Sequence, residues 1–235
     1  EFSMDSPSNQ HLETRARILD TAEFLFSDRG FRNVSLREIT RDAEVNTAAV
    51  NYHFGSKEAL IGEVFARVVT PINEERLRLL DEAEARHGKE PVPIEEILYC
   101  VLSPVVSQLQ QSPHRDSVYL KLAGRCLSEP AENFSETIVS LFREVIGRIM
   151  RAVSKTLPGL PESDIFWRMH FSFGTMVYAL THGDRVALFS DGRVSPAEPE
   201  EILDHLVRFT AAGLRAESDP ISPSLPAAAS NPGRK

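Results

Sequence analysis

Helix start and stop signals follow one another closely in the first quarter of this chain. Ser35–Glu38 reads Ser-Leu-Arg-Glu, a capping box in which the serine and the glutamate each satisfy a free backbone N–H at the start of a helix. Gly30 and Gly55 suit the left-handed conformation that ends a helix. We therefore expect a first helix over about residues 11–29 and a second, of barely three turns, over residues 35–43.

A third and very short helix is expected directly after the second. Asn46 or Thr47 can cap it, because both side chains accept a hydrogen bond from a backbone N–H, and it ends at residue 52 or 53. Ser56 then caps a fourth helix, whose apolar positions recur at helical spacing to about Arg86. Two short helices joined by a tight turn form a helix-turn-helix, whose second helix enters the major groove of DNA.

The rest of the chain also reads as helix, because alternating apolar and polar runs bounded by hairpin turns are absent. We expect an all-α protein. The segment 162–189 is apolar on nearly every side, so both of its faces require cover. Residues 1–10 are interpreted as a cloning scar and a disordered arm, and the proline-rich residues 217–235 as a disordered tail. Further helices are expected near residues 93–111, 115–128, 131–156, 162–189 and 198–216.

Charge and composition exclude several classes of protein. A formal net charge of −8 argues against a protein that coats nucleic acid by charge alone, since such binding depends on basic side chains that neutralise phosphates. Residues 11–60 carry seven Lys or Arg and eight Asp or Glu, so any DNA contact depends on local geometry. Only Cys100 and Cys126 occur, well apart, which favours reduced thiols and a cytoplasmic protein. No apolar run is long enough to span a bilayer, so no membrane partner is expected.

Small and polar side chains dominate the expected third helix. Thr47, Ala48 and Asn51 lie on its exposed side, where a methyl group can meet a thymine methyl and an amide can pair with adenine. Arg37, at the start of the second helix, can reach a phosphate or a guanine edge. Two alternatives stay open: Asn51 can cap the helix locally, and Arg37 can be a solvated side chain paired with Glu38.

Phosphate-binding groups follow at the end of the same helix. The Tyr52 hydroxyl and the His53 imidazole can each donate a hydrogen bond to a phosphate oxygen, although either ring can also be a packed aromatic. Lys57 lies in the first turn of the fourth helix, where free backbone N–H groups and the positive end of the helix dipole form a phosphate site. Residues 46–57 therefore combine base-reading and phosphate-binding groups.

Six short motifs occur in a fixed order along the first sixty or so residues: Ile18–Ala22, Leu25–Phe26, Gly30–Phe31, Ser35–Ile39, Ala43–Val45 and Val50–Leu60. By these motifs the region resembles the DNA-binding domain of the TetR family of transcriptional repressors. One position departs from a common form of the family pattern, because Asn51 stands where leucine is frequent. The resemblance implies a DNA-binding headpiece over residues 11–60. It implies DNA contacts by Ser35, Arg37, Thr47, Ala48, Asn51, Tyr52, His53 and Lys57, with Thr14 or Arg15 touching the DNA backbone.

The resemblance also assigns the remaining helices to a body for ligand binding and dimerisation, over residues 61–216. Family members dimerise through their last two helices, which correspond here to residues 162–189 and 198–216. A symmetric homodimer supplies two headpieces at a fixed separation for a palindromic site on double-stranded DNA. The alternative for residues 162–189 is a central helix in a monomer.

A small-molecule effector that releases a repressor from its operator is a further implication of the resemblance. Aromatic side chains with a few polar partners can line a cavity for a largely apolar molecule. The headpiece is similar to that of a fatty-acid-responsive branch of the family, so a fatty acid or acyl thioester is the first candidate. The alternative for each aromatic residue is ordinary core packing. Candidate lining residues are Phe134, Phe142, Trp167, Phe171, Phe173 and Tyr178, with Arg125, Arg148 and His170 as polar partners.

Two rival functions stay open at this point. One is a DNA-binding dimer without a small effector, controlled by a protein partner. The other is a helical-bundle enzyme, because Glu84 and His87 have the Glu-x-x-His spacing of carboxylate-bridged metal bundles. Such bundles need a second copy of this motif and two further glutamates, so we expect no catalytic residues, no metal site and no cofactor.

Overall fold

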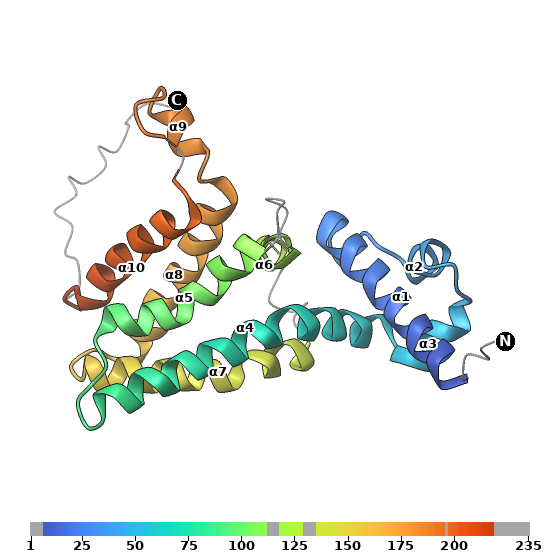
Figure 1. Ribbon diagram of the computed structural model, residues 1–235, viewed down its shortest axis with the longest axis horizontal. Coiled ribbons are helices and arrows are strands. Elements are labelled where there is room, and N and C mark those ends of the chain that lie inside the picture. Colours follow the sequence, from blue (N-terminus) through green and yellow to red (C-terminus); the bar gives the residue numbers. More distant parts are fainter. Residues whose placement is uncertain (1–6, 112–117, 129–134, 196, 219–235) are drawn as a thin grey trace, which may run out of the picture.

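The computed structural model describes residues 7–111, 118–128, 135–195 and 197–218 of the chain. Every regular element in these ranges is a helix, which confirms the all-α prediction (Figure 1). None of the described helices is both long and apolar enough to cross a membrane.

Three helices form the headpiece: α1 (Pro7–Arg29), α2 (Leu36–Asp42) and α3 (Thr47–Phe54). Their order agrees with the prediction, but α1 begins earlier than expected. Proline suits the first position of a helix, which needs no N–H donor, and Pro7 occupies that position. Residues 7–10 of the expected disordered arm are therefore helical, whereas residues 1–6 lie outside the described residues. The headpiece core includes Ile18, Leu25, Phe26, Ile39, Val50 and Leu60.

A single helix of 31 residues, α4 (Lys57–His87), connects the headpiece to the body (Figure 1). Leu60 in its first turn belongs to the headpiece core, and its later turns pack in the body core. The Phe31 ring spans the junction, with ring centroids 5.7 Å from Phe26 and 5.3 Å from Phe65 of α4. The two cores therefore adjoin along one continuous helix.

The body also reaches the headpiece through α6 (Val118–Ser128). Leu122 of α6 is only 2% exposed and belongs to the headpiece core. The Arg125 guanidinium donates a hydrogen bond to the backbone carbonyl of Asp28, near the end of α1. Headpiece and body are therefore joined along α6 as well as α4.

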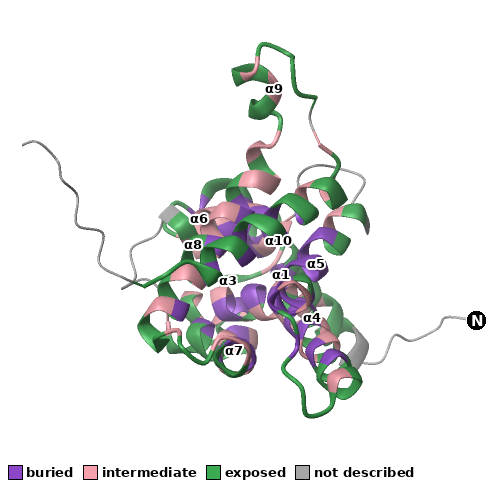
Figure 2. Cartoon of the chain, turned by 90° about the vertical axis from the view of Figure 1, so that its left-hand side faces the viewer, coloured by how far each residue is buried: buried purple, intermediate pink, exposed green. Residues whose placement is uncertain are grey.

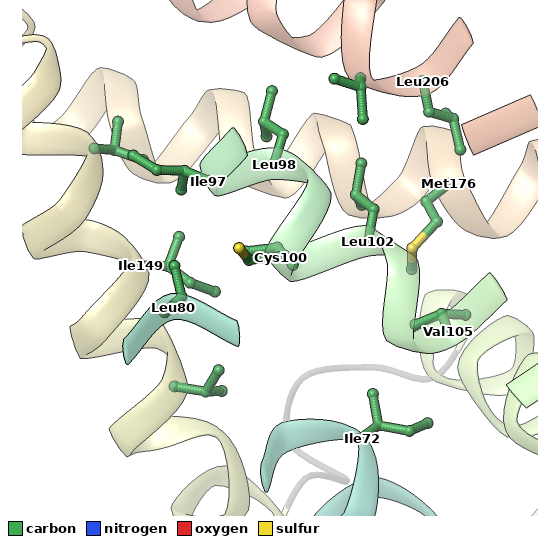
Figure 3. Close-up of a cluster of buried hydrophobic side chains, with 14 of the residues drawn as sticks. Ile72, Leu80, Ile97, Leu98, Cys100, Leu102, Val105, Ile149, Met176 and Leu206 are labelled. Carbon is green, nitrogen blue, oxygen red and sulfur yellow. The ribbon is translucent and has the colours of Figure 1, made fainter. Parts of the chain in front are cut away.

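The other long helices of the body are α5 (Ile94–Gln111), α7 (Glu136–Thr156), α8 (Glu162–His182) and α10 (Pro199–Arg215). α5 packs against both α4 and α10, and α7 packs along α4. Side chains from five helices converge in the body core (Figure 3): Ile72 and Leu80 of α4, Ile97, Leu98 and Leu102 of α5, Ile149 of α7, Met176 of α8, and Leu206 of α10.

The single helix expected over residues 162–189 is two helices. α8 ends at His182, and a separate helix of five residues, α9 (Arg185–Phe189), follows. Gly183 and Asp184 lie between them, and both residue types have low helix propensity. α9 stands clear of the bundle and is largely exposed (Figure 2).

The start of one other helix also differs from the prediction. The helix expected over residues 131–156 begins at Glu136, because the Ser135 hydroxyl caps it by accepting a hydrogen bond from the Ile138 N–H at 3.4 Å. Residues 112–117 and 129–134, which include parts of two expected helices, lie outside the described residues.

Buried polar groups in the body form hydrogen bonds between helices. Arg76 of α4 is 6% exposed and donates from Nε to the Val101 carbonyl of α5 at 2.8 Å. A second Arg76 nitrogen donates to Asn73 Oδ1 at 3.0 Å, and the Asn73 amide donates to the Leu141 carbonyl of α7 at 2.9 Å. This network ties α4 to two of its neighbours.

Candidate nucleic-acid interface

A capping box and a tight turn set the arrangement of α2 and α3. The Ser35 N–H donates to Glu38 Oε2 at 2.8 Å and the Glu38 N–H donates to Ser35 Oγ at 3.3 Å, which confirms the predicted box. The Ser35 hydroxyl also donates to Glu38 Oε2 at 2.8 Å, and the hydrogen bonds from the Ser35 N–H and hydroxyl lower the pKa of Glu38, so its carboxylate stays ionised at neutral pH. Between the helices Glu44 has φ of 54°, in the left-handed region that L residues rarely adopt. The chain therefore turns sharply here without a glycine.

The third helix has one buried and one exposed face. Asn46 Oδ1 accepts a hydrogen bond from the Ala48 N–H at 3.0 Å, so Asn46 rather than Thr47 is the cap. Val50 and Phe54 are buried and hold α3 against the headpiece core. In the described part of the chain the Asn51 side chain makes no hydrogen bond, and the helix is capped without it. The exposed face of α3 carries Thr47, Ala48 and Asn51.

Three rings meet where the end of α3 approaches the start of α1. The Tyr52 side chain is 75% exposed, and its ring lies edge-on to His11 at 5.1 Å between centroids. The His53 ring lies 4.3 Å from His11 and 5.3 Å from Tyr52. Burial lowers the pKa of His53, and the charges of His11 and Arg15 lower it further, so at pH 7 the neutral imidazole donates one N–H.

His11 is a candidate site residue that the sequence prediction missed. Its position is about forty residues from Tyr52 and His53 along the chain, and no local motif surrounds it. Only the packing of α1 against α3 brings its ring to the phosphate-binding candidates. Because it contacts both rings, His11 limits the orientations that they can adopt.

Arg37 and Lys57 supply positive charge at the starts of α2 and α4. Arg37 is exposed, and no described side chain pairs with its guanidinium, since Glu38 bonds Ser35 and Arg29 instead. Lys57 is partly exposed in the first turn of α4 and also has no ion-pair partner among the described residues. Both cations are therefore available to an anion from outside the chain.

The other residues expected to contact DNA, which are Thr14, Arg15 and Ser35, have partners within the chain. The Thr14 hydroxyl donates to a backbone carbonyl one turn earlier at 2.9 Å. Arg15 donates to Glu63 of α4 at 2.9 Å, and its guanidinium lies 5.3 Å from the centre of the Phe54 ring. The Ser35 hydroxyl takes part in the capping box. In this structure Arg15 and Ser35 hold helices in place, and their contact with DNA stays a prediction.

Among the residues that the structure describes, those predicted to bind an effector do not lie around one interior cavity. Phe142 and Phe173 are half-buried against the body core. Arg148 of α7 donates to Asp81 at 2.6 Å and to Glu84 at 2.8 Å, both on α4. Phe142, Phe173 and Arg148 therefore take part in packing and in an ion-pair bridge between helices.

Trp167, His170 and Phe171 lie on the outer face of α8. Trp167 is 62% and Phe171 60% exposed, and their ring centroids are 5.8 Å apart. The expectation that they line an interior cavity is not met in the single chain, because other side chains of α8 already fill its inner face. Phe134 lies outside the described residues.

Arg125 and Tyr178 are the two effector candidates that do line a cavity, of about 560 Å³, between α1, α6 and α8.

Glu84 and His87, which have the Glu-x-x-His spacing of metal bundles, bond to different partners. Glu84 accepts a hydrogen bond from Arg148, and His87 Nε2 lies 2.7 Å from Glu96 Oε2. In the described ranges, no three His, Cys, Asp or Glu side chains gather as a metal site requires.

Two family models match the sequence. The model for bacterial regulatory proteins of the tetR family matches residues 18–64, and the model for the tetracyclin repressor-like C-terminal domain matches residues 99–213. Together the two ranges span more than half of the chain. The first includes α2, α3 and the start of α4, and the second includes α6, α7, α8 and α10.

Individual regulators of known sequence or structure are also similar to this chain. The HTH-type transcriptional regulator AcrR of Shigella flexneri is 36% identical over 97 residues, which are 41% of this chain and 43% of that protein. The chain spans less than half the length of the curated relatives that it matches. A tetR family transcription regulator from Shewanella sp. PV-4 superposes with a TM-score of 0.55 at 17% identity, over 86% of this chain and 95% of its own. The fatty acid degradation regulator FadR from Bacillus halodurans gives 0.54 at 15%, over 92% and 100%. At these identities the two structures establish a shared fold.

Proposed function

Because the chain belongs to the TetR family of bacterial regulatory proteins, we propose that it is a DNA-binding transcriptional regulator that reads DNA with α3. The observation that carries this proposal is the division of α3 into two faces. Val50 and Phe54 anchor the helix, while Asn51 and Tyr52 are exposed. One surface therefore offers groups for base edges and for phosphates, beside the cation of Lys57.

The regulator acts as a homodimer on a palindromic operator. Exposed aromatic side chains on the outer faces of the last two long helices support this part of the proposal, since Trp167 and Phe171 of α8 and Phe209 of α10 are each at least 60% exposed in the single chain. Pairing of these faces in two copies gives a four-helix interface with twofold symmetry. Each headpiece then reads one half-site.

A small and largely apolar effector releases the repressor from its operator. α4 supports this part, because the same helix carries Lys57 at one end and packs in the body core at the other. An effector must bind the released conformation more tightly than the DNA-bound one by several kcal/mol to switch the protein. A fatty acid or acyl thioester is the first class to test, since a structure of the same fold is described as a fatty acid degradation regulator.

Selection of bound sequences from a genomic DNA library tests the proposal first, followed by affinity measurements on the enriched operator. Lys57→Ala should weaken binding roughly tenfold and reduce the salt dependence by about one phosphate contact, and Tyr52→Phe should also weaken binding to every sequence. Asn51→Ala should mainly relax sequence preference. Arg208→Ala, which removes an exposed cation of α10 paired with Asp204, is the matched control. Unchanged operator affinity in all three headpiece variants would overturn the residue assignments.

A further inference from the structure

Three aromatic rings of the headpiece touch one another, and one of them comes from α1. We call His11, Tyr52 and His53 the ring cluster. The Tyr52 ring stands edge-on to both imidazoles, with centroids 5.1 Å apart and planes at 81° for His11, and 5.3 Å and 80° for His53. The two imidazole centroids lie 4.3 Å apart. Each ring of the cluster therefore contacts the other two.

The ring cluster lies at the surface of the headpiece. Tyr52 is 75% exposed, His11 is exposed and His53 is only partly buried. Burial of apolar area therefore contributes little to holding these rings together. Edge-to-face contacts are favourable in their own right, because the positive edge of one ring meets the negative face of another. Their main effect here is to orient rings that water would otherwise leave free to turn.

His11 is the member of the cluster that comes from a second helix. Consecutive positions of a helix do not face each other, so α3 alone does not fix the Tyr52 and His53 rings against one another. The position of His11 is itself anchored one turn later along α1. There Arg15 donates to a glutamate of α4 at 2.9 Å, and its guanidinium lies 5.3 Å from the centre of the Phe54 ring of α3. The crossing of α1 and α3 therefore places His11 against both rings.

We propose that His11 is a positioning residue for DNA binding, whose ring holds Tyr52 in the orientation in which the Tyr52 hydroxyl meets a phosphate of the DNA backbone. This inference rests on the DNA-binding function proposed above. A side chain that is oriented before binding loses less conformational freedom when it binds, so the contact raises affinity without touching DNA itself. His11 precedes residues 18–64, the range that matches the tetR family model, so its contact is not part of the matched pattern.

Operator affinity of the full chain separates positioning from direct contact. His11→Ala should weaken binding about three- to tenfold, whereas His11→Phe, which keeps a ring but has no N–H group, should stay within about twofold of the parent chain. Leu12→Ala, at an exposed residue of the same turn, is the matched control and should change affinity less than about twofold. A loss in His11→Phe as large as that in His11→Ala overturns the positioning role, since it assigns a hydrogen bond with DNA to the imidazole. Unchanged affinity in His11→Ala overturns it as well.

A double-mutant cycle on operator affinity tests whether His11 acts through Tyr52. Tyr52→Phe should weaken binding at least about threefold less in the His11→Ala background than in the parent chain, because the hydroxyl is no longer held in place there. In the His11→Phe background its full effect should return. A general loss of headpiece structure does not produce this pattern. Losses that simply add in the double variant overturn the proposal.

The free chain gives a readout that needs no DNA. Fluorine NMR of the chain labelled with 3-fluorotyrosine reports the surroundings of each tyrosine ring, and Tyr52→Phe identifies the Tyr52 signal. That signal should shift in His11→Ala and stay near its parent position in His11→Phe and Leu12→Ala. A Tyr52 signal that His11→Ala leaves unchanged overturns the contact.

Thermal melts that match those of the parent chain establish that the variants are folded. A chain that binds no operator at all refutes the proposed function and with it the role of His11 in DNA binding. The fluorine signal then still decides whether His11 holds the Tyr52 ring. Failure of the inference and failure of the proposed function are therefore distinguishable.

Discussion

On α3 of the headpiece the residues that face solvent are small or polar apart from the Tyr52 ring, whereas on α8 of the body they include Trp167 and Phe171. The first surface is stable in water and meets its partner only when DNA is present. The second exposes aromatic area whose burial is worth roughly 25 cal/mol per Å². The exposed face of α3 therefore needs no second copy of the chain, whereas the outer face of α8 is the one that a second copy would cover in the proposed dimer.

Placing charge on the outer face of α8 is the most direct test of whether this face is the dimer interface. Trp167→Glu combined with Phe171→Glu should raise the dimer dissociation constant by more than about 100-fold, because central aromatic residues of an interface each contribute roughly 2 kcal/mol or more. Sedimentation velocity at micromolar concentration measures it. Phe24→Glu, at a headpiece phenylalanine that is 66% exposed, should leave the dimer intact. A double variant that stays dimeric means that the aromatic face is not the interface.

The buried polar groups of the headpiece and the body also differ in their hydrogen-bond partners, and the Arg76→Ala variant tests this difference. In the headpiece the buried Ser27 hydroxyl bonds within its own helix, whereas Arg76 bonds a carbonyl of another helix. Removing Arg76 takes away the donor to Asn73 Oδ1 and one donor to the Val101 carbonyl, and it should cost about 2–3 kcal/mol in the free energy of unfolding.

Urea denaturation measures this loss. Arg78→Ala is the control, because Arg78 lies on the same helix but pairs with glutamates on the surface, and it should change stability little. Equal losses in the two variants would contradict the structural role of the buried network.

Two buried threonines give opposite expectations in the two regions. Thr210 Oγ1 in the body is buried and has no hydrogen-bond partner among the described residues, so Thr210→Val should stabilise the protein by about 1 kcal/mol. Thr40 Oγ1 in the headpiece donates to the Arg37 carbonyl at 3.1 Å, so Thr40→Val should destabilise it by about 0.5–1 kcal/mol. Thermal and urea unfolding of both variants measure the signs. Changes of the same sign would remove this contrast.

The smallest expected effect is the pH dependence of operator affinity through His53, at the end of α3 that is predicted to contact phosphate. Burial first, and then His11 and Arg15, lower the pKa of His53 in the free protein, so the imidazole is neutral at pH 7. A DNA phosphate favours the protonated ring, so binding takes up a proton and operator affinity should rise as pH falls from 7.5 to 6. The gain stays below about tenfold, because it corresponds to one charge-assisted hydrogen bond. His53→Gln should flatten the profile, and an equally steep profile in that variant would assign the proton to another group.

The sequence could predict the features that local residue types determine, but not those that depend on how helices pack against one another. The Ser35 capping box, the Asn46 and Ser56 caps and the Gly55 helix end are local signals, so the order and the approximate limits of α2 and α3 followed from residue types alone. The positions of His11 and Arg76 depend on how helices cross. No local pattern contains that information, and both contacts were missed.

α8 shows most clearly what the sequence pattern alone could not predict. Its composition correctly indicated a helix with two apolar faces, but periodicity does not say which face meets the same chain. Trp167 and Phe171 were therefore expected in an interior cavity and lie on the outside. The break at Gly183 was missed because the apolar pattern continues through α9, where Leu188 and Phe189 are exposed.

Leu122 has a consequence for the synthesis of the chain. It fills part of the headpiece core, yet it follows Leu60, the last headpiece residue of that core, by about sixty positions. Ribosomes add roughly 5–20 residues per second. A nascent headpiece therefore waits several seconds with an unfilled place in its core, and its folding is complete only after α6 has emerged.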